Sequence, residues 1–168
     1  MGESFMPSII ILCTANMCRS PIAEALLLQK LQQQTDTSDW RVESAGTWTI
    51  TGRPVAPKSQ EVMQRLYGFD LSAHRSRLVS RTLLRRFDLI LVMEAGQKEA
   101  IQVEFPELAS RVYLIYEMVG KVHNVNDPIG GTTVDFEDTA HELDDLLTRG
   151  LDRIIRLANG KKQEENGC

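Results

Sequence analysis

Short apolar runs alternate with helix-forming segments along this chain, and this alternation limits the fold more than any other feature. The first run, SIIILC at 8–13, has the length and β-branched content of a buried strand. Similar runs at 41–45, 88–93 and 111–115 predict three more strands, and helical patterns separate them. One last helix is expected at 140–158, where apolar residues recur at helical spacing. The pattern predicts an α/β fold with a four-stranded, mainly parallel sheet flanked by helices.

The 168 residues are expected to form one domain over 8–160, since no repeat or linker-like change in composition divides the chain. Residues 1–7 and the polar segment 161–168 are predicted to be flexible ends. Lys and Arg (19) against Asp and Glu (23) give a net charge of −4, so no nucleic-acid partner is expected. The sequence leaves the oligomeric state open.

Neither a membrane span nor a signal peptide is expected. The apolar runs are too short to cross a bilayer, and the run near the N-terminus has no basic leader. The three cysteines, Cys13, Cys18 and Cys168, are too few for a disulfide framework. A reducing, cytoplasmic location without a membrane partner is therefore expected, and the thiols need another explanation.

The segment 13–21, CTANMCRSP, joins the first strand to the first helix. Ser20 is a favourable N-cap and Pro21 suits the first helical position, so the helix is expected to begin there. Backbone N–H groups of such a loop can point inward and bind an anion at the helix N-terminus, beyond the carboxyl end of the strand. A phosphate-binding loop is thus predicted between the first strand and the first helix.

Cys13 and Arg19 give this loop its chemistry. Arg19 offers a planar, permanently charged fork that matches two oxygens of a phosphate. A cysteine in that positive concavity favours the thiolate form, which is the nucleophile. The Cys-x5-Arg spacing alone is weakly specific, because a strand-end thiol and a surface arginine would match it too. The strand before it, the helix start after it and an acid candidate downstream favour catalysis.

At these residues the sequence resembles the low-molecular-weight protein tyrosine phosphatase family, from residue 9 to about 157. The most specific matches are 13–21 with the following Ala23-Glu24, the segment 44–46 and the pair Asp127-Pro128. The resemblance implies a cysteine-dependent phosphatase that uses no metal or organic cofactor. Its partner would be a phosphorylated protein or peptide substrate.

The resemblance assigns Cys13 as the nucleophile, Arg19 as the phosphate clamp, and Asp127 as the general acid and then the base. Expelling a phenoxide requires a proton, and hydrolysing a phosphocysteine requires removing one, so an acid–base residue is needed. An Asp-Pro in a glycine-containing loop is by itself a common turn signal. The resemblance also places the rest of the loop at the substrate, namely Thr14, Ala15, Asn16, Met17, Cys18 and Ser20.

Supporting roles follow from the same resemblance. Ser20 would hydrogen-bond the Cys13 thiolate, and Asn16 would hold the loop in a left-handed turn, which Asn tolerates well. Ser44 and His74, together with Asn16, would buttress the loop from behind. For His74 alone, a purely structural role is the simpler interpretation.

Cys18 has two interpretations that the sequence leaves open. The matching pair in the family forms a reversible disulfide with the nucleophile and shields it from over-oxidation. Alternatively, Cys18 fills space behind the loop. Cys168, in the terminal segment, is assigned no role.

The substrate is less constrained than the reaction. Trp48 and Ile129 are expected to line the substrate site, although Trp48 would equally well pack under its own loop. Eukaryotic family members usually follow Asp-Pro with tyrosines, whereas this chain has IGG at 129–131. A branch with Asp-Pro-x-Gly-Gly includes protein-arginine phosphatases, which carry threonine where this chain has Met17. Methionine lacks that hydroxyl, so we predict phosphotyrosine, with phosphoarginine as the alternative.

Two other classes of protein share parts of this pattern. Arsenate reductases of one type use the same loop, but they need further cysteines downstream, and none occurs between Cys18 and Cys168. Non-catalytic phosphate-binding relatives typically lose the cysteine, the arginine or the acid, and all three candidates are present here. An enzyme is therefore predicted over either alternative.

Overall fold

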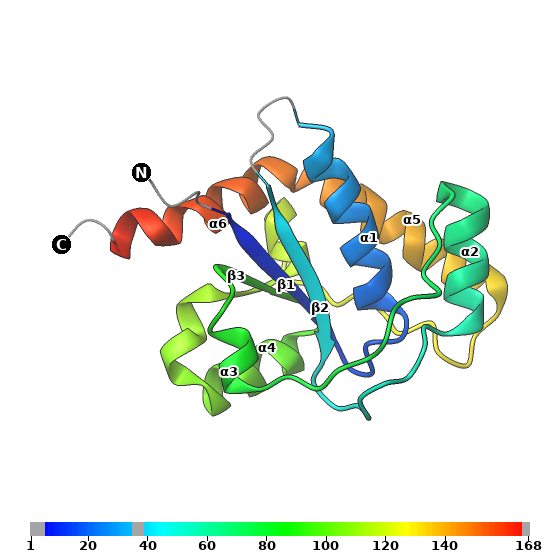
Figure 1. Ribbon diagram of the computed structural model, residues 1–168, viewed down its shortest axis with the longest axis horizontal. Helices are drawn as coiled ribbons and strands as arrows, with labels where there is room; N and C mark the ends of the chain where they lie inside the picture. Colours follow the sequence, from blue (N-terminus) through cyan, green and yellow to red (C-terminus); the bar gives the residue numbers. More distant parts are fainter. Residues whose placement is uncertain (1–5, 35–38, 166–168) are drawn as a thin grey trace.

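A four-stranded sheet of parallel strands forms the centre of the molecule and confirms the predicted α/β fold (Figure 1). The computed structural model describes residues 6–34 and 39–165; the parts of the predicted flexible ends at 1–5 and 166–168 lie outside this range. In pairing order, the strands are β2 (Arg41–Gly46), β1 (Ser8–Cys13), β3 (Leu89–Val92) and β4 (Val112–Leu114).

Every residue of the two central strands, β1 and β3, is buried. Their unbroken apolar sequences suit strands that are covered on both faces. Successive side chains alternate between the faces: Ile9 and Ile11 enter one core cluster, and Ile10 and Leu12 enter the other. The sheet therefore requires helices on both sides.

Helices cover both faces of the sheet (Figure 1). On one side lie α1 (Arg19–Gln32), α5 (Thr133–Arg149) and α6 (Leu151–Glu165), with α2 (Pro57–Tyr67) packed against α5. On the other side lie α3 (Arg81–Leu84), α4 (Ala95–Glu104) and the 3-10 helix η1 (Pro106–Arg111). A second 3-10 helix, η2 (Ile115–Val119), follows β4.

The prediction of one continuous last helix is wrong, because Gly150 separates α5 from α6. A Cβ atom at Gly150 would lie 2.6 Å from the Cβ of Met118 in η2, so the chain passes η2 at a distance that suits only glycine. The apolar spacing continues across the break, since Leu143 and Ile154 enter the same core cluster.

The predicted N-cap of the first helix is also wrong. Helix α1 begins at Arg19, and Cys18 occupies the N-cap position. Ser20 lies inside the first turn, where its hydroxyl is engaged by Cys13 and Asn16 rather than by the helix N–H groups. Proline at the next position is tolerated because the first turn needs no N–H from it.

Strand β1 has β2 on one side and β3 on the other, so the strand order reverses between β1 and β3. In open α/β sheets, ligands bind in the crevice beyond the carboxyl ends of the strands at such a reversal. The loop after β1 and the segment 93–95 after β3 border this crevice. Within the described part of the chain, no helix combines the length and apolar character that crossing a membrane requires.

Candidate active site

The predicted phosphate-binding loop lies between Cys13, the last residue of β1, and Arg19, the first residue of α1, and both side chains are buried. Asn16 has a φ of 57°, the left-handed conformation expected for it, and no other non-glycine among the described residues has a positive φ. Cys18 forms no side-chain cap, so the N–H groups at the start of α1 retain donor capacity for an anion. The loop thus offers backbone donors beside a buried thiol and a buried guanidinium.

Strand β2 approaches this loop closely at Gly46. The N–H of Thr47 donates to Cys13 O (2.9 Å), and the N–H of Trp48 donates to Thr14 O (3.0 Å). A Cβ atom at Gly46 would lie 2.6 Å from Thr14 O, so a larger residue would displace the loop. This approach explains why the segment 44–46 stands out in the sequence.

Buried hydroxyl and amide groups surround the thiol. Cys13 Sγ lies 3.0 Å from Ser20 Oγ, and Asn16 Nδ2 donates to both Ser20 Oγ (2.8 Å) and Ser44 Oγ (3.0 Å). Because the Ser20 oxygen already accepts from Asn16, its own proton is available to the sulfur. The Ser20 hydroxyl is therefore placed to donate to the Cys13 sulfur.

A second set of contacts holds Asn16 from behind. His74 Nε2 lies 2.7 Å from Asn16 O, and this nitrogen carries the proton because a carbonyl only accepts. Burial lowers the pKa of His74 below its usual value, which favours the neutral ring. The N–H of Arg77 donates to Asn16 Oδ1 (3.1 Å). The structure thus brings together the three predicted supporting residues, Asn16, Ser44 and His74.

Glu24 joins this group, although its role was not predicted. The Ser44 hydroxyl donates to Glu24 Oε2 (2.9 Å), and burial is the main cause that raises the pKa of this carboxyl. Asn16 therefore donates in two directions, through Ser20 to the thiol and through Ser44 to the carboxyl group. Glu24 follows Ser20 by four residues on α1, a spacing that places both on one helix face and could have identified it.

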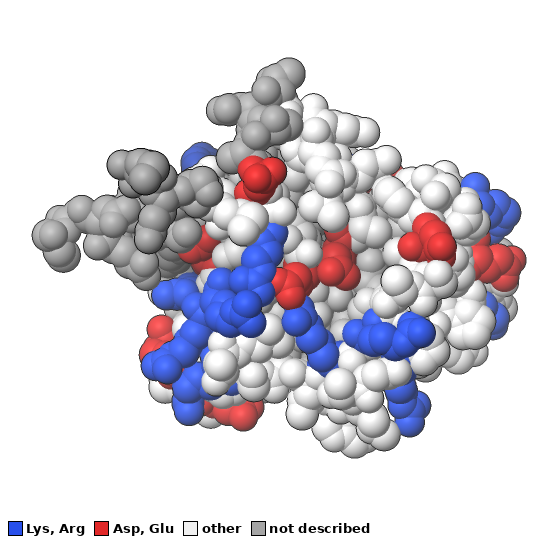
Figure 2. Space-filling model, in the orientation of Figure 1, with Lys and Arg blue, Asp and Glu red and all other residues white. Residues whose placement is uncertain are grey.

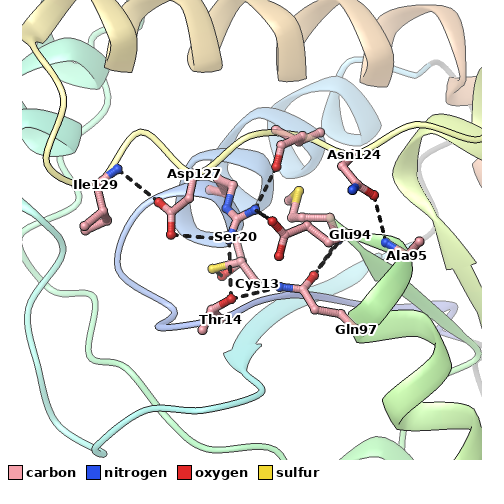
Figure 3. Close-up of polar contacts among 12 residues, drawn as sticks. Cys13, Thr14, Ser20, Glu94, Ala95, Gln97, Asn124, Asp127 and Ile129 are labelled. Atoms are coloured by element: carbon pink, nitrogen blue, oxygen red, sulfur yellow. Dashed lines mark hydrogen bonds and ion pairs between the residues drawn. The ribbon is translucent and has the colours of Figure 1, made fainter.

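Two carboxylates and a carbonyl face the Arg19 guanidinium (Figure 3). Arg19 Nη1 donates to Val125 O (2.7 Å) and lies 3.2 Å from Glu94 Oε1. Arg19 Nη2 lies 3.5 Å from Asp127 Oδ2 and from Thr14 Oγ1. The guanidinium is thereby oriented within the loop, and Asp127 lies beside it; its acid–base role stays a prediction.

A turn presents the Asp127 carboxylate to the loop. Asp127 Oδ1 accepts from the N–H of Ile129 (3.0 Å), and Pro128 O accepts from the N–H of Gly131 (2.8 Å). Gly130 has a φ of 81°, which permits the turn. With one oxygen engaged by the turn, the other oxygen of Asp127 points toward the Arg19 side of the loop (Figure 3).

Glu94 and Gln97 contact the site but were missed by the sequence analysis. Gln97 Oε1 accepts from the N–H groups of Met93 and Glu94 (both 3.0 Å), and its Nε2 donates to Thr14 Oγ1 (3.1 Å). Gln97 thus ties the start of α4 to the loop (Figure 3). The available signal was their place directly after β3, at the end of the sheet where the strand order reverses.

Two cavities flank this site. One, of about 330 Å³, is lined by Ala15, Met17, Trp48, Thr49, Ile50 and Arg53. Trp48 is 82% exposed, so it does not pack under its own loop. Ile129 instead lines a separate cavity of about 260 Å³, together with Asp127 and three other acidic residues, Asp135, Asp138 and Glu142. The structure does not bring Trp48 and Ile129 into one cavity.

Cys18 packs into the core cluster behind the loop. Burial raises its pKa to about 12, so its thiol remains protonated near neutral pH. Both Cys13 and Cys18 are free thiols, and Cys168 lies outside the described residues. The arrangement agrees with the space-filling interpretation in the reduced protein, and the disulfide stays a prediction.

Comparison with known proteins places these features in one family. The family model for low molecular weight phosphotyrosine protein phosphatases matches residues 8–161. The probable low molecular weight protein-tyrosine-phosphatase EpsP of Ralstonia solanacearum is 36% identical over 148 residues, covering 88% of this chain and 93% of that protein. The protein-arginine-phosphatase of Bacillus subtilis is 32% identical over 140 residues, covering 83% of this chain and 91% of that protein.

A solved structure leads to the same assignment. The low molecular weight protein tyrosine phosphatase from T. tengcongensis superposes with a TM-score of 0.82 at 32% identity, covering 89% of this chain and 99% of that one. The chain therefore belongs to the low-molecular-weight protein tyrosine phosphatase family, whose members are cysteine-dependent phosphatases.

Proposed function

We propose that the protein hydrolyses phosphotyrosine in proteins or peptides, with Cys13 as the nucleophile. The observation that carries the proposal is the apolar cavity that joins Met17 of the loop to the exposed indole of Trp48. A phenyl ring gains from stacking and burial against such side chains. Relatives named as tyrosine phosphatases, such as those of Ralstonia solanacearum and Acinetobacter johnsonii, support the same substrate class.

In the first step, the Cys13 thiolate attacks phosphorus, an S–P bond forms and the bond to the phenol oxygen breaks. Arg19 binds two phosphoryl oxygens with its fork, and the N–H groups of the loop stabilise the charge of the transition state. Protonated Asp127 donates its proton to the departing phenolate, and this requires a carboxyl group beside the loop.

In the second step, Asp127 is a carboxylate and accepts a proton from water as the water oxygen attacks phosphorus. The S–P bond breaks, inorganic phosphate leaves and the Cys13 thiolate is restored. The Ser20 hydroxyl, 3.0 Å from the sulfur, stabilises this leaving thiolate. The proposed mechanism uses no metal or organic cofactor.

Phosphoarginine is a second candidate substrate, and one cavity favours it. Ile129 and Asp127 line a cavity to which Asp135, Asp138 and Glu142 contribute carboxylates. A guanidinium next to the scissile bond is cationic after phosphorus is lost, so carboxylates near Asp127 would stabilise it. The relatives named as protein-arginine phosphatases support this alternative.

The test compares kcat/KM on one peptide sequence carrying phosphotyrosine, phosphoarginine or phosphoserine. We expect phosphotyrosine to be preferred, and Met17→Thr to lower that preference by reducing the apolar area at the cavity. A higher kcat/KM on phosphoarginine for the unmodified protein would replace the first candidate with the second. Equal rates on all three peptides would contradict both.

A further inference from the structure

Arginine side chains gather at the end of the sheet opposite the catalytic loop. Figure 2 shows Lys and Arg side chains concentrated over α3 and the amino-terminal ends of the strands. Arg41 is the first residue of β2, Arg85 and Arg86 lie shortly before β3, and Arg111 directly precedes β4. This concentration is local, because the whole chain carries a net charge of −4.

These arginines enclose a cavity of about 250 Å³. The described residues that line it are four arginines, one aspartate, one serine and two apolar residues: Arg41, Arg85, Arg86, Arg111, Asp88, Ser8, Met6 and Phe87. We call this feature the arginine cavity. Among the described residues the positive charges at the cavity outnumber the negative ones even with Arg41 paired to Glu43, and this excess favours an anion.

Two of the arginines are held in place by Phe87. The guanidinium of Arg41 lies over the Phe87 ring, 4.6 Å from its centre, and pairs with Glu43. Arg111 Nη1 donates to Phe87 O (3.0 Å). Both side chains are only partly exposed, and these contacts hold their guanidinium groups in place before any ligand arrives.

The other two arginines are exposed and available. Within the described residues, the side chains of Arg85 and Arg86 donate no hydrogen bond and form no ion pair. Two other carboxylates that pair with arginines here are already engaged, Glu43 with Arg41 and Arg77 and Glu107 with Arg81. The guanidinium groups of Arg85 and Arg86 are therefore available to a ligand, next to two guanidinium groups that Phe87 holds in place.

Among the described residues that line the cavity, the one acidic side chain is already hydrogen-bonded. Asp88 is buried, and its Oδ2 accepts from the N–H of Ser8 (3.0 Å) and from its hydroxyl (3.1 Å). Its carboxylate is therefore compensated within the start of β1, which reduces its repulsion of an anion at the arginines.

We propose that the arginine cavity is a second phosphoryl-binding site, distinct from the catalytic loop. Arginine forks match pairs of phosphoryl oxygens, and charge-assisted bonds of this kind are stronger than neutral ones. Ser8 and Cys13 are the two ends of β1, so the cavity lies roughly 17 Å along the strand from the nucleophile. One phosphoryl group cannot reach both, and a group in the cavity is bound rather than hydrolysed.

The ligand is either a phosphorylated side chain of a protein or a small phosphate compound, since both present the same oxygens. The test uses amide NMR spectra of Cys13→Ser protein, which prevents turnover, with inorganic pyrophosphate and a singly phosphorylated tyrosine peptide as probes. The amides of Ser8, Phe87 and Asp88 report on the cavity, and those of 14–19 report on the loop. We expect saturable shifts in the cavity set, with an affinity different from that of the loop set.

The double variant Arg85→Gln/Arg86→Gln tests the assignment directly. It is expected to weaken pyrophosphate binding at the cavity at least about tenfold, as loss of charge-assisted bonds implies, and to leave the loop set unchanged. The matched control Arg149→Gln/Arg156→Gln removes the same charge from α5 and α6 and is expected to change neither set. With Cys13 intact, both double variants should hydrolyse para-nitrophenyl phosphate like the unmodified protein, which verifies their fold.

Each result has a defined meaning. Cavity shifts with the peptide support a phosphorylated side chain as ligand, and cavity shifts with pyrophosphate alone support a small phosphate compound. The absence of saturable cavity shifts with both probes would overturn the proposal. Equal weakening in the two double variants would also overturn it, because bulk charge would then explain the binding.

Discussion

The predicted phosphate-binding loop and the mouth proposed for it, formed by Trp48 and Ile129, differ in how their side chains are held. Cys13, Asn16 and Ser20 are buried and hydrogen-bonded to one another and to residues from β2 and the 74–77 segment. Trp48 and Ile129, by contrast, are exposed and line separate cavities. The difference teaches that the fold holds the residues proposed for the chemistry at phosphorus more tightly than the residues proposed to contact the leaving group.

Removing the guanidinium fork should have the largest effect in the loop. Arg19→Lys keeps a positive charge but loses the paired donors, so kcat/KM is expected to fall about 10²–10³-fold, as for loss of a transition-state donor. Steady-state kinetics on para-nitrophenyl phosphate measure it. A loss below tenfold would show that charge alone, without the fork, suffices in the loop.

The second-largest effect is expected from removing the hydrogen bonds that Asn16 makes to support the loop. Asn16→Ala removes the donors to Ser20 and Ser44 and places a Cβ-bearing residue less tolerant of φ 57°, so we expect a loss of about 1–3 kcal/mol in the free energy of unfolding. Asn16→Gly is the matched control, since it keeps the backbone conformation and loses the same hydrogen bonds. Urea unfolding separates the two causes: equal losses would assign the effect to the side chain alone.

The buried Glu24 carboxyl should make the free energy of unfolding depend on pH. Its pKa is raised by burial, so the folded state binds more protons than the unfolded state above pH 4.5. The contribution is therefore fully present below pH 4.5 and is lost as the pH rises through the folded pKa. Relative to Glu24→Gln, the unmodified protein is expected to lose stability as the pH rises from 4.5. Parallel stability curves for the two proteins would contradict the assignment.

Substitutions at the mouth of the loop should have the smallest effects, and these should fall mainly on substrate binding. Trp48→Ala is expected to raise KM for a phosphotyrosine peptide by roughly 2–10-fold, the range of one aromatic contact, with kcat nearly unchanged. Its stability should change by less than about 0.5 kcal/mol, since the side chain is exposed. A drop in kcat as large as the drop in kcat/KM expected for Arg19→Lys would contradict the distinction between the loop and its mouth.

The parts predicted well from sequence are those in which neighbours along the chain make the structure. The first strand and the existence of a helix after the loop follow one another within a short stretch of sequence, so their signals are local, although α1 begins at Arg19 rather than after Ser20. Glu94 and Gln97 were missed because they reach Arg19 and Thr14 only through the pairing of β1 with β3. Nothing in their local sequence specifies that pairing.

The errors have similar causes. Serine is favoured at N-cap positions, but the Ser20 hydroxyl contacts the Cys13 sulfur instead of capping the helix. The break at Gly150 was hidden because glycine is tolerated inside helices and the apolar spacing continues beyond it. Its cause is the approach of η2, which lies about thirty residues earlier in the chain.

The central claim is that a phosphoryl group is transferred to Cys13 and then released as inorganic phosphate with help from Asp127. Its most direct test is rapid-quench mass spectrometry of Asp127→Asn protein mixed with para-nitrophenyl phosphate, whose good leaving group needs little protonation. We predict that a phosphoryl group accumulates on the peptide containing Cys13, since water activation is slowed. A phosphoryl group on another residue, or turnover that persists at the normal rate in Cys13→Ser, would contradict it.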